Sequence, residues 1–192
     1  MANTKEIQKR MKSIKDTMKI TSAMHMIASS NLQKAKKNLE ETEPYFYTLQ
    51  IMIAGILGHM QGGIEHQYFD ERPEIKEADR KKGYIVVTAD KGLAGGYNHN
   101  VIKLAQEFLD KPGHNELFVL GQLGRSYFQK KNVDVDTSFK YTVQKPTMHR
   151  ARVIAEKMLD LFNRKELDEV HIIYTRMENA VEMVAETKQL LP

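Results

Sequence analysis

The stretch that decides the fold runs from Lys5 to Ala35 and reads KEIQKRMKSIKDTMKITSAMHMIASSNLQKA. Neither glycine nor proline interrupts it, and the next proline along the chain is Pro44. Asn3 can cap the first helical turn, and Glu6, three residues on, can complete a capping box. A helix that starts at Asn3 and ends just before Pro44 would be a rod of about 58 Å, since each residue adds about 1.5 Å. Few small domains can bury such a rod against themselves.

Apolar residues recur along this helix at alternating steps of four and three, which is the heptad pattern of a coiled coil. Thr21 and His25 occupy two polar positions of this stripe. A second apolar stripe opens beside the first, and residues 20–33 carry no formal charge. Two stripes predict two neighbours, a partner helix and a surface outside it. The helix-pairing stripe contains Ile7, Met11, Ile14, Met18, Ala28, Leu32, Ala35 and Leu39, and the second stripe contains Ile20, Met24 and Ile27.

Beyond the rod, the sequence predicts a change of organisation. Thr42 and Pro44 indicate a restart or a kink, because proline fits the first turn of a helix but disrupts its interior. Apolar residues within 45–60 predict a further helix that ends near Gly62 and Gly63. Residues 64–82 are polar without periodicity. We therefore expect an N-terminal helical shaft over residues 1–63, a connector over 64–82 and an α/β domain over 83–192.

The C-terminal part alternates strand-like and helix-like segments. This alternation predicts a Rossmann-like domain whose sheet is mainly parallel, with right-handed crossovers. We expect strands near residues 84–89, 117–120, 133–141, 170–175 and 181–185, and helices that end near residue 110, surround 125–131 and span 147–164.

Composition excludes several classes of protein. The 192 residues carry a net charge of +4, and 41% of them are hydrophobic, a normal value for a globular chain. The excess of basic residues is concentrated in the first forty, so the partner of that segment should be acidic or anionic. No cysteine is present, which excludes disulfides and thiolate sites. No apolar run reaches the roughly 20 residues of a membrane span, and no signal peptide is apparent.

The turn over residues 90–98, DKGLAGGYN, lies where an α/β domain would hold a phosphate, between the end of a strand and the start of a helix. It matches neither the dinucleotide fingerprint nor the P-loop. A tight turn or a partner-contact loop is therefore the favoured interpretation. A nucleotide- or phosphate-binding α/β module with a coiled-coil oligomerisation arm stays open as the alternative function.

The sequence gives little support for metal binding, for catalysis or for binding to nucleic acid or a membrane. The seven histidines show no paired metal-ligand spacing, and no nucleophile elbow is present. We interpret the acidic pairs Glu40-Glu41 and Asp168-Glu169 as solvated ends of elements. The basic helix has no aromatic residue before Tyr45, which disfavours nucleic acid and a membrane surface as its target. We expect neither catalysis nor a cofactor or metal.

Three segments together resemble one protein family. The stretch from Lys5 to Ala35 resembles the N-terminal signature of the γ subunits of F-type ATP synthases. VVTADKGLAGGYN, over residues 86–98, is similar to a glycine-rich segment of that family, and the ending TKQLLP is also typical of it. These three segments, in order, span essentially the whole chain.

The resemblance implies a non-catalytic rotor of the central stalk, which couples rotation of the c-ring to the conformational cycle of the catalytic β subunits. Implied partners are the α and β subunits of the F1 ring, the ε subunit and the c-ring, at the cytoplasmic face of the bacterial inner membrane. The N-terminal helix would pair, antiparallel, with a C-terminal helix. The residues implied to face the ring are Lys9, Arg10, Lys12, Lys15, Lys19, Ile20, Met24, Ile27 and Lys91.

Two positions depart from the pattern of this family, Ser22 where a basic residue is common and His25 where Glu is common. The chain also stops at Pro192, where members of the family continue into the long C-terminal helix. An exposed apolar stripe of this length invites association. We therefore expect this form to self-associate through its N-terminal helix, or to bend that helix back onto the domain.

Overall fold

The computed structural model describes residues 3–59, 65–133, 135–136, 141–179 and 182–192. Contacts divide the chain into two compact units, Met1–Ile64 and Glu65–Pro192. Residues 65–80, which the sequence assigned to a connector, therefore fall in the same unit as the sheet.

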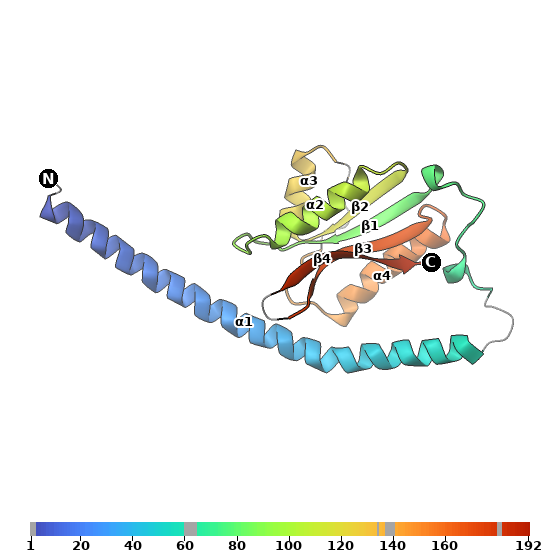
Figure 1. The fold of residues 1–192 in the computed structure, drawn as a ribbon, viewed down its shortest axis with the longest axis horizontal. Coiled ribbons are helices and arrows are strands. Elements are labelled where there is room, and N and C mark those ends of the chain that lie inside the picture. Colours follow the sequence, from blue (N-terminus) through green and yellow to red (C-terminus); the bar gives the residue numbers. More distant parts are fainter. Residues whose placement is uncertain (1–2, 60–64, 134, 137–140, 180–181) are drawn as a thin grey trace. The chain divides into compact units, whose positions relative to one another are not determined.

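The first unit is one long helix, α1, over Thr4–His59 (Figure 1). The side chain of Asn3 caps it by accepting a hydrogen bond from the backbone N–H of Lys5 at 3.2 Å. The carboxylate of Glu6 accepts a hydrogen bond from Arg10, one turn further along. No side chain of α1 is buried. The apolar residues of this helix therefore find no core within their own unit.

The sequence predicted a restart or a kink near Pro44, and α1 continues through the proline without a restart. The helix nevertheless changes direction where its colour passes from blue to cyan, in the stretch that contains Pro44 (Figure 1). Proline removes one backbone donor and its ring collides with the preceding turn, so a bend is the expected result. Thr42 and Thr48 each donate a hydroxyl hydrogen bond of 2.7 Å to the carbonyl four residues back, which also favours bending. The predicted end of the helix at Gly62 and Gly63 lies outside the described residues.

The second unit contains a four-stranded sheet in the order β2-β1-β3-β4. The strands are β1 over Lys81–Val87, β2 over His114–Leu120, β3 over Glu169–Met177 and β4 over Met183–Leu191. β1 pairs in parallel with β2 and β3, whereas β4 pairs antiparallel with β3. The predicted mainly parallel sheet is confirmed.

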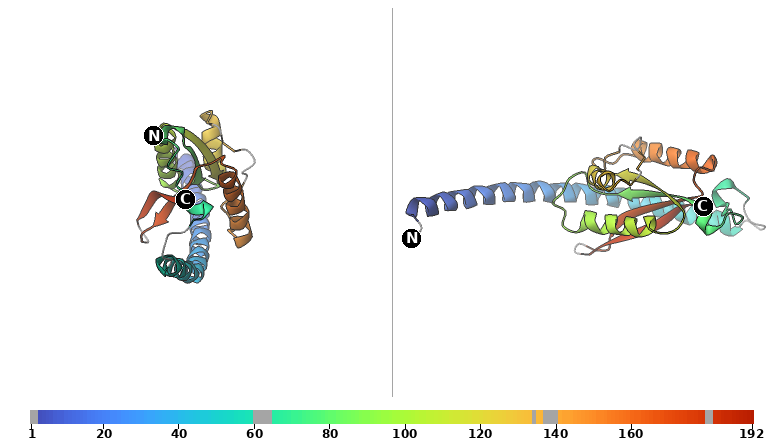
Figure 2. Two further views of the ribbon diagram at one scale, coloured as in Figure 1. Left: turned by 90° about the vertical axis from the view of Figure 1, so that its right-hand side faces the viewer. Right: turned by 90° about the horizontal axis from the view of Figure 1, so that it is seen from above.

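Helices cover both faces of the sheet (Figures 1 and 2). They are α2 over Tyr97–Leu109, α3 over Gln122–Lys130 and α4 over Met148–Asn163, and two short 3-10 helices, η1 over Gln67–Phe69 and η2 over Glu77–Asp79, precede β1. Val101 of α2 and Phe128 of α3 pack on one face, against Val86 of β1. Met158 of α4 packs on the other face, with Phe118 of β2. Each central strand is thus buried on both sides, which explains the unbroken apolar run of β1.

Two expected strands need correction or qualification. The last strand is longer than the predicted 181–185, since β4 extends to Leu191 and lies at the edge of the sheet. Of the strand predicted over 133–141, the structure shows one isolated bridge, between Val135 and Leu117. Residues 134 and 137–140 lie outside the described part of the chain. Within the described residues, no helix combines the length and apolar character needed to cross a membrane.

Candidate functional site

The carboxyl ends of β1 and β2 are where an open α/β sheet usually binds its ligand. Here the backbone is packed very closely. A Cβ atom on Gly121 would lie 2.2 Å from the carbonyl oxygen of Thr88, and one on Gly124 would lie 2.6 Å from the Thr88 side chain. Gly121 also has φ of 95°, which a side chain would strain. These two glycines let α3 begin directly against the end of β1.

The Thr88 hydroxyl connects these elements. It donates a hydrogen bond of 2.9 Å to the carbonyl of Leu120 and accepts one of 3.0 Å from the N–H of Gly124. The side-chain oxygen of Asn98 accepts a hydrogen bond of 2.8 Å from the N–H of Ala89. The start of the glycine-rich turn is therefore fixed on both sides by buried polar side chains.

Asp90 provides the negative charge at this edge. One carboxylate oxygen accepts a hydrogen bond of 3.1 Å from the N–H of Gln122, in the first turn of α3. The other oxygen accepts bonds of 3.2 Å from the N–H groups of Val143 and Gln144. A phosphate group would use the same backbone donors at a helix N-terminus. Because the carboxylate already binds them, the arrangement disfavours a nucleotide at this position.

The tip of the turn points away from these contacts. Lys91 is exposed, and the side chain of Leu93 is 92% exposed at a backbone φ of 65°. Tyr97, at the start of α2, is partly buried, and burial raises the pKa of its hydroxyl. The turn therefore exposes a basic and an apolar side chain, and a partner that would contact them stays a prediction.

All of the predicted stripe residues lie on α1. Their large apolar side chains are about half exposed or more, from Ile7 at 47% to Met18 at 64%. Met24 and Ile27 of the second stripe are 50% and 63% exposed. The structure places both stripes on one continuous helix, and their partners stay a prediction.

The predicted ring-facing basic residues Lys9, Arg10, Lys12, Lys15 and Lys19 are also exposed on α1. Arg10 pairs with Glu6 at 2.7 Å and Lys19 with Asp16 at 3.8 Å, both on the same helix. Such exposed pairs contribute little to stability and exchange readily with other partners. The basic side chains therefore remain available to an acidic surface.

A charged cluster at the amino ends of the strands was missed by the sequence analysis. Asp168 and Glu169 are only 4% and 9% exposed, so their interpretation as a solvated end is wrong. Asp168 binds Arg72, and Glu169 binds Arg80 at 2.9 Å and His171 at 2.8 Å. Nothing in the local sequence signals the contacts with Arg72 and Arg80, because these residues lie about ninety positions from their partners.

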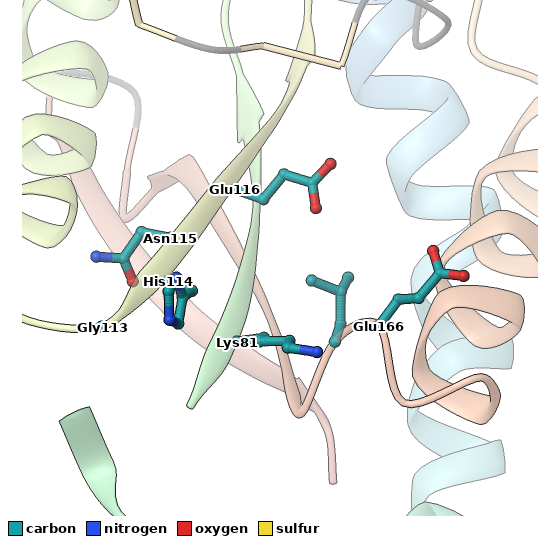
Figure 3. Close-up of a pocket in the computed structure, with 7 residues that line it drawn as sticks. Lys81, Gly113, His114, Asn115, Glu116 and Glu166 are labelled. Carbon is teal, nitrogen blue, oxygen red and sulfur yellow. The ribbon is translucent and has the colours of Figure 1, made fainter. Parts of the chain in front are cut away.

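The same edge carries an open pocket (Figure 3), whose lining includes the side chains of Lys81, Glu116 and Glu166. Beside the charged cluster, the ring of Tyr84 stacks on His171 at a centroid distance of 5.2 Å. Burial, with Glu169 and Glu77 nearby, raises the pKa of Tyr84 to about 12. Across the described residues, no group of three His, Asp or Glu side chains could hold a metal ion. Ligands of open α/β sheets bind at the other end of the strands, so we assign this pocket no ligand.

Comparison with protein families identifies the chain. The family model described as ATP synthase matches residues 3–192. An ATP synthase gamma chain of Acetivibrio thermocellus is 46% identical over 192 residues, which is 100% of this chain and 64% of the relative. The chain belongs to the ATP synthase gamma-chain family. Gamma chains of Ruminiclostridium cellulolyticum and, with a sodium-specific name, of Acetobacterium woodii are 48% and 34% identical over 99% of this chain.

The chain spans 64%, 64% and 61% of the length of these three gamma chains. Two solved structures share its fold. A chain from the central stalk and c-ring of the Tetrahymena thermophila mitochondrial ATP synthase matches with a TM-score of 0.64 and 23% identity, over 90% of this chain and 72% of that one. A chain from the Euglena gracilis rotor matches with a TM-score of 0.60 and 15% identity, over 96% and 61%. The fold of this chain is thus also found in chains of these two ATP synthase structures.

Proposed function

We propose that this gamma chain acts in the central-stalk rotor of an F-type ATP synthase. Residues 1–63 would form the shaft and residues 83–192 the base. The observation that carries the proposal is α1 itself, a helix of 56 residues with two apolar stripes and no buried side chain. A helix of this kind is stable only when other proteins or helices cover it.

The first stripe would pair with a second helix, which the family resemblance identifies as the C-terminal helix of longer gamma chains. The positions that flank this stripe in the heptad, from Gln8 to Asn38, carry basic or neutral side chains and no acidic one. Charges at such flanking positions determine the choice of partner in coiled coils. We therefore expect the paired helix to carry Glu or Asp along its flanks. The flanking residues are Gln8, Arg10, Lys15, Thr17, Ser22, Met24, Ser29, Asn31, Lys36 and Asn38.

The second stripe and the basic residues would face the ring of α and β subunits. Lys9, Lys12 and Lys15 would attract acidic segments of the β subunits, because exposed charges interact over distances near 10 Å and tolerate sliding. Ile20, Met24 and Ile27 lie within a segment that has no charged residue. A rotating shaft could turn there without breaking buried ion pairs, whose rupture costs several kcal/mol.

Chemistry would then belong to the β subunits, with the gamma chain transmitting mechanical work between them and the c-ring. Each β subunit would contact a different side of the shaft, and this difference shifts its conformational equilibrium. The exposed tip of the glycine-rich turn, with Lys91, would be a further contact with β. The ε subunit and the c-ring would bind the α/β unit at the cytoplasmic face of the bacterial inner membrane. One relative carries a sodium-specific name, so the coupling ion could be a proton or a sodium ion. Ion transport by the reconstituted complex decides between the two.

The test replaces Met24 with Lys in the full-length gamma chain, reconstituted with its complex in vesicles. The measurement is the number of ions pumped for each ATP hydrolysed. We expect Met24→Lys to lower this ratio, since a charge would enter the uncharged contact. Met24→Leu is the matched control, because it changes the side chain at the same position without adding a charge. An unchanged ratio for Met24→Lys would exclude the proposed role of this stripe. Failure of α and β to co-purify with the chain would overturn the function itself.

A further inference from the structure

The α/β unit carries opposite charges at the two ends of its strands. Residues 65–79, at the amino ends, contain six acidic side chains and two basic ones, of which Arg72 is buried. Residues 88–100 and 141–152, at the carboxyl ends, contain four Lys or Arg side chains and one acidic side chain, Asp90. Such a separation of charge orients a charged partner as it approaches. Three of the four basic side chains lie next to the start of α4 and form what we call the α4 basic patch, which consists of Lys145, Arg150 and Arg152.

Asp90 fixes the stretch of chain that leads into this patch. Its carboxylate accepts hydrogen bonds of 3.2 Å from the N–H groups of Val143 and Gln144, and so joins the stretch before α4 to the glycine-rich turn. Figure 1 shows that turn and the start of α4 at the same end of the sheet. The carboxylate also binds the N–H of Gln122, so three donors surround this single negative charge. The charge that this end presents to solvent is therefore mainly positive.

The cations of the α4 basic patch are accessible. Lys145, three residues before the helix begins, is exposed, and so are Arg150 and Arg152. Arg150 donates a hydrogen bond of 2.9 Å to the carbonyl of Gln144, which orients its guanidinium. Lys145 and Arg152 form no ion pair with any described residue. Since residues 141–155 contain no Asp or Glu, these cations are available to the carboxylates of another molecule.

A pocket lies beside these charges. It measures about 440 Å³ and is lined by Tyr141, Thr142, His149, Arg150 and Val153. Pockets that combine apolar and polar side chains receive the anchor side chains of partners at protein interfaces. A flat layer of lipid headgroups would leave this recess empty, whereas a side chain of a docked protein would fill it. The shape of the surface therefore favours a protein over a membrane.

We propose that the α4 basic patch docks an acidic segment of another protein. Carboxylates of that segment would pair with the three cations, and one of its side chains would enter the pocket. Charge complementarity of this kind accelerates association and selects the partner. A small anion is a poorer occupant, because the cations lie on an open surface and the nearest N–H donors already bind Asp90. The proposed function uses α1 and Lys91, so this inference goes beyond it and does not depend on it.

The first experiment uses an acidic peptide as the probe. It is a synthetic, alanine-rich peptide of about 20 residues with Glu along one face of its helix. The peptide is titrated into the isotope-labelled chain, and amide chemical shifts report binding at each residue separately, which is needed because α1 is basic as well. We expect saturable shifts over residues 141–152 that weaken as sodium chloride increases, and none with a peptide that carries Gln in place of Glu. Shifts confined to α1 would overturn the proposal.

Charge reversal at the two ends of α4 locates the contact. Arg152 and Lys165 are both exposed, and replacing either with Glu changes the net charge equally. Residue 165 lies about 20 Å from residue 152 along the helix, roughly twice the distance over which exposed charges interact at about 0.1 M salt. We expect Arg152→Glu to lower the affinity measured at residues 141–152 at least about fivefold, and Lys165→Glu to leave it within about twofold. Circular dichroism checks that both variants fold. Equal losses would show that net charge alone matters, against the proposal.

Two further probes test other occupants of the patch. The first is cosedimentation of the same variants with vesicles of phosphatidylcholine and phosphatidylglycerol. We expect Arg152→Glu and Lys165→Glu to cosediment equally, and a loss specific to Arg152→Glu would assign the patch to a membrane surface instead. The second is inorganic phosphate, which should shift the amides of residues 141–152 no more than chloride does at equal ionic strength. A saturable shift with phosphate would make the patch a site for small anions and would also overturn the proposal.

Discussion

Arg72 donates a hydrogen bond from Nη1 to Oδ1 of Asp168 over 2.6 Å, although 96 positions separate the two residues in the chain. The side chains are only 6% and 5% exposed. Arg72 also donates bonds of 2.8 Å to the carbonyls of Leu167 and Phe162, and its guanidinium lies 4.3 Å from the centre of the Phe162 ring. Together with the pair formed by Arg80 and Glu169, this side chain fixes residues 65–80 to the start of β3.

We expect Arg72→Met to lower the free energy of unfolding of the α/β unit by about 3 kcal/mol, because it leaves Asp168 buried without its cation. Urea denaturation followed by tyrosine fluorescence measures the change. Arg164→Met is the control, since Arg164 forms a pair of 2.8 Å with Asp160 in which both side chains are more than half exposed. It should cost less than about 1 kcal/mol. Similar losses in the two variants would argue against a structural role for the buried pair.

Acid should weaken the same contact. Burial opposes ionisation of Asp168, but the N–H of Lys81 and the guanidinium of Arg72 outweigh it, so the pKa lies below its ordinary value of 3.8. A carboxyl group whose pKa is lower in the folded state stabilises the fold at pH values above its unfolded-state pKa. This stabilisation is lost as the pH falls through the folded-state pKa. We expect the free energy of unfolding to decrease as pH drops below about 4, and to decrease less steeply in Asp168→Asn. Equal slopes would show that other carboxyl groups dominate.

Gly121 should tolerate no side chain. A methyl group there would meet the Thr88 carbonyl at 2.2 Å, at a φ of 95°. We expect Gly121→Ala to destabilise the α/β unit by about 3 kcal/mol or more, since backbone must move to relieve the contact. Gly92→Ala, in the adjacent turn, is the control, because its nearest neighbour atom lies 4.0 Å away. Thermal unfolding compares the two, and a similar melting temperature for both would contradict the close packing.

Removing the Asp90 carboxylate should create an anion site. In Asp90→Ala, the N–H groups of Gln122, Val143 and Gln144 lose their acceptor. We expect a lower melting temperature that phosphate or sulfate partly restores, because an anion bound to the folded state stabilises it by mass action. The unmodified chain should show no stabilisation by phosphate, ADP or NAD beyond that of chloride at equal ionic strength. A strong shift with ADP would instead support the alternative nucleotide-binding function.

Association through α1 should depend on salt. Because its flanking positions are basic or neutral, two α1 helices from separate chains would repel each other through Arg10, Lys15 and Lys36. We expect sedimentation of the chain to show more dimer as sodium chloride increases. Replacing Arg10 and Lys15 with Gln should remove much of this dependence. A dimer that dissociates with salt would contradict the repulsion.

The sequence predicted the long helix and the alternating α/β unit, because periodicity and strand-helix alternation are local signals. It left open whether the helix restarts or kinks at Pro44, since a proline inside a helix and one in its first turn leave the same local pattern. It also missed the pairing of Arg72 with Asp168, and the use of the Asp90 carboxylate to bind the amides of three other residues. These contacts join segments from 32 to 96 positions apart, and only the folded chain reveals them. The partners of both α1 stripes stay predictions.

Pro44 has a consequence for any helix that lies along α1. The bend is caused by a covalent ring, so it persists whether or not a partner is bound. In knobs-into-holes packing, the heptad positions of two helices stay in register along their length. A change of direction in one helix interrupts this register unless the other helix bends with it. Continuous pairing is thus confined to the forty or so residues before the proline, about 60 Å of helix. The position of Pro44 in the chain therefore determines where continuous pairing along α1 ends.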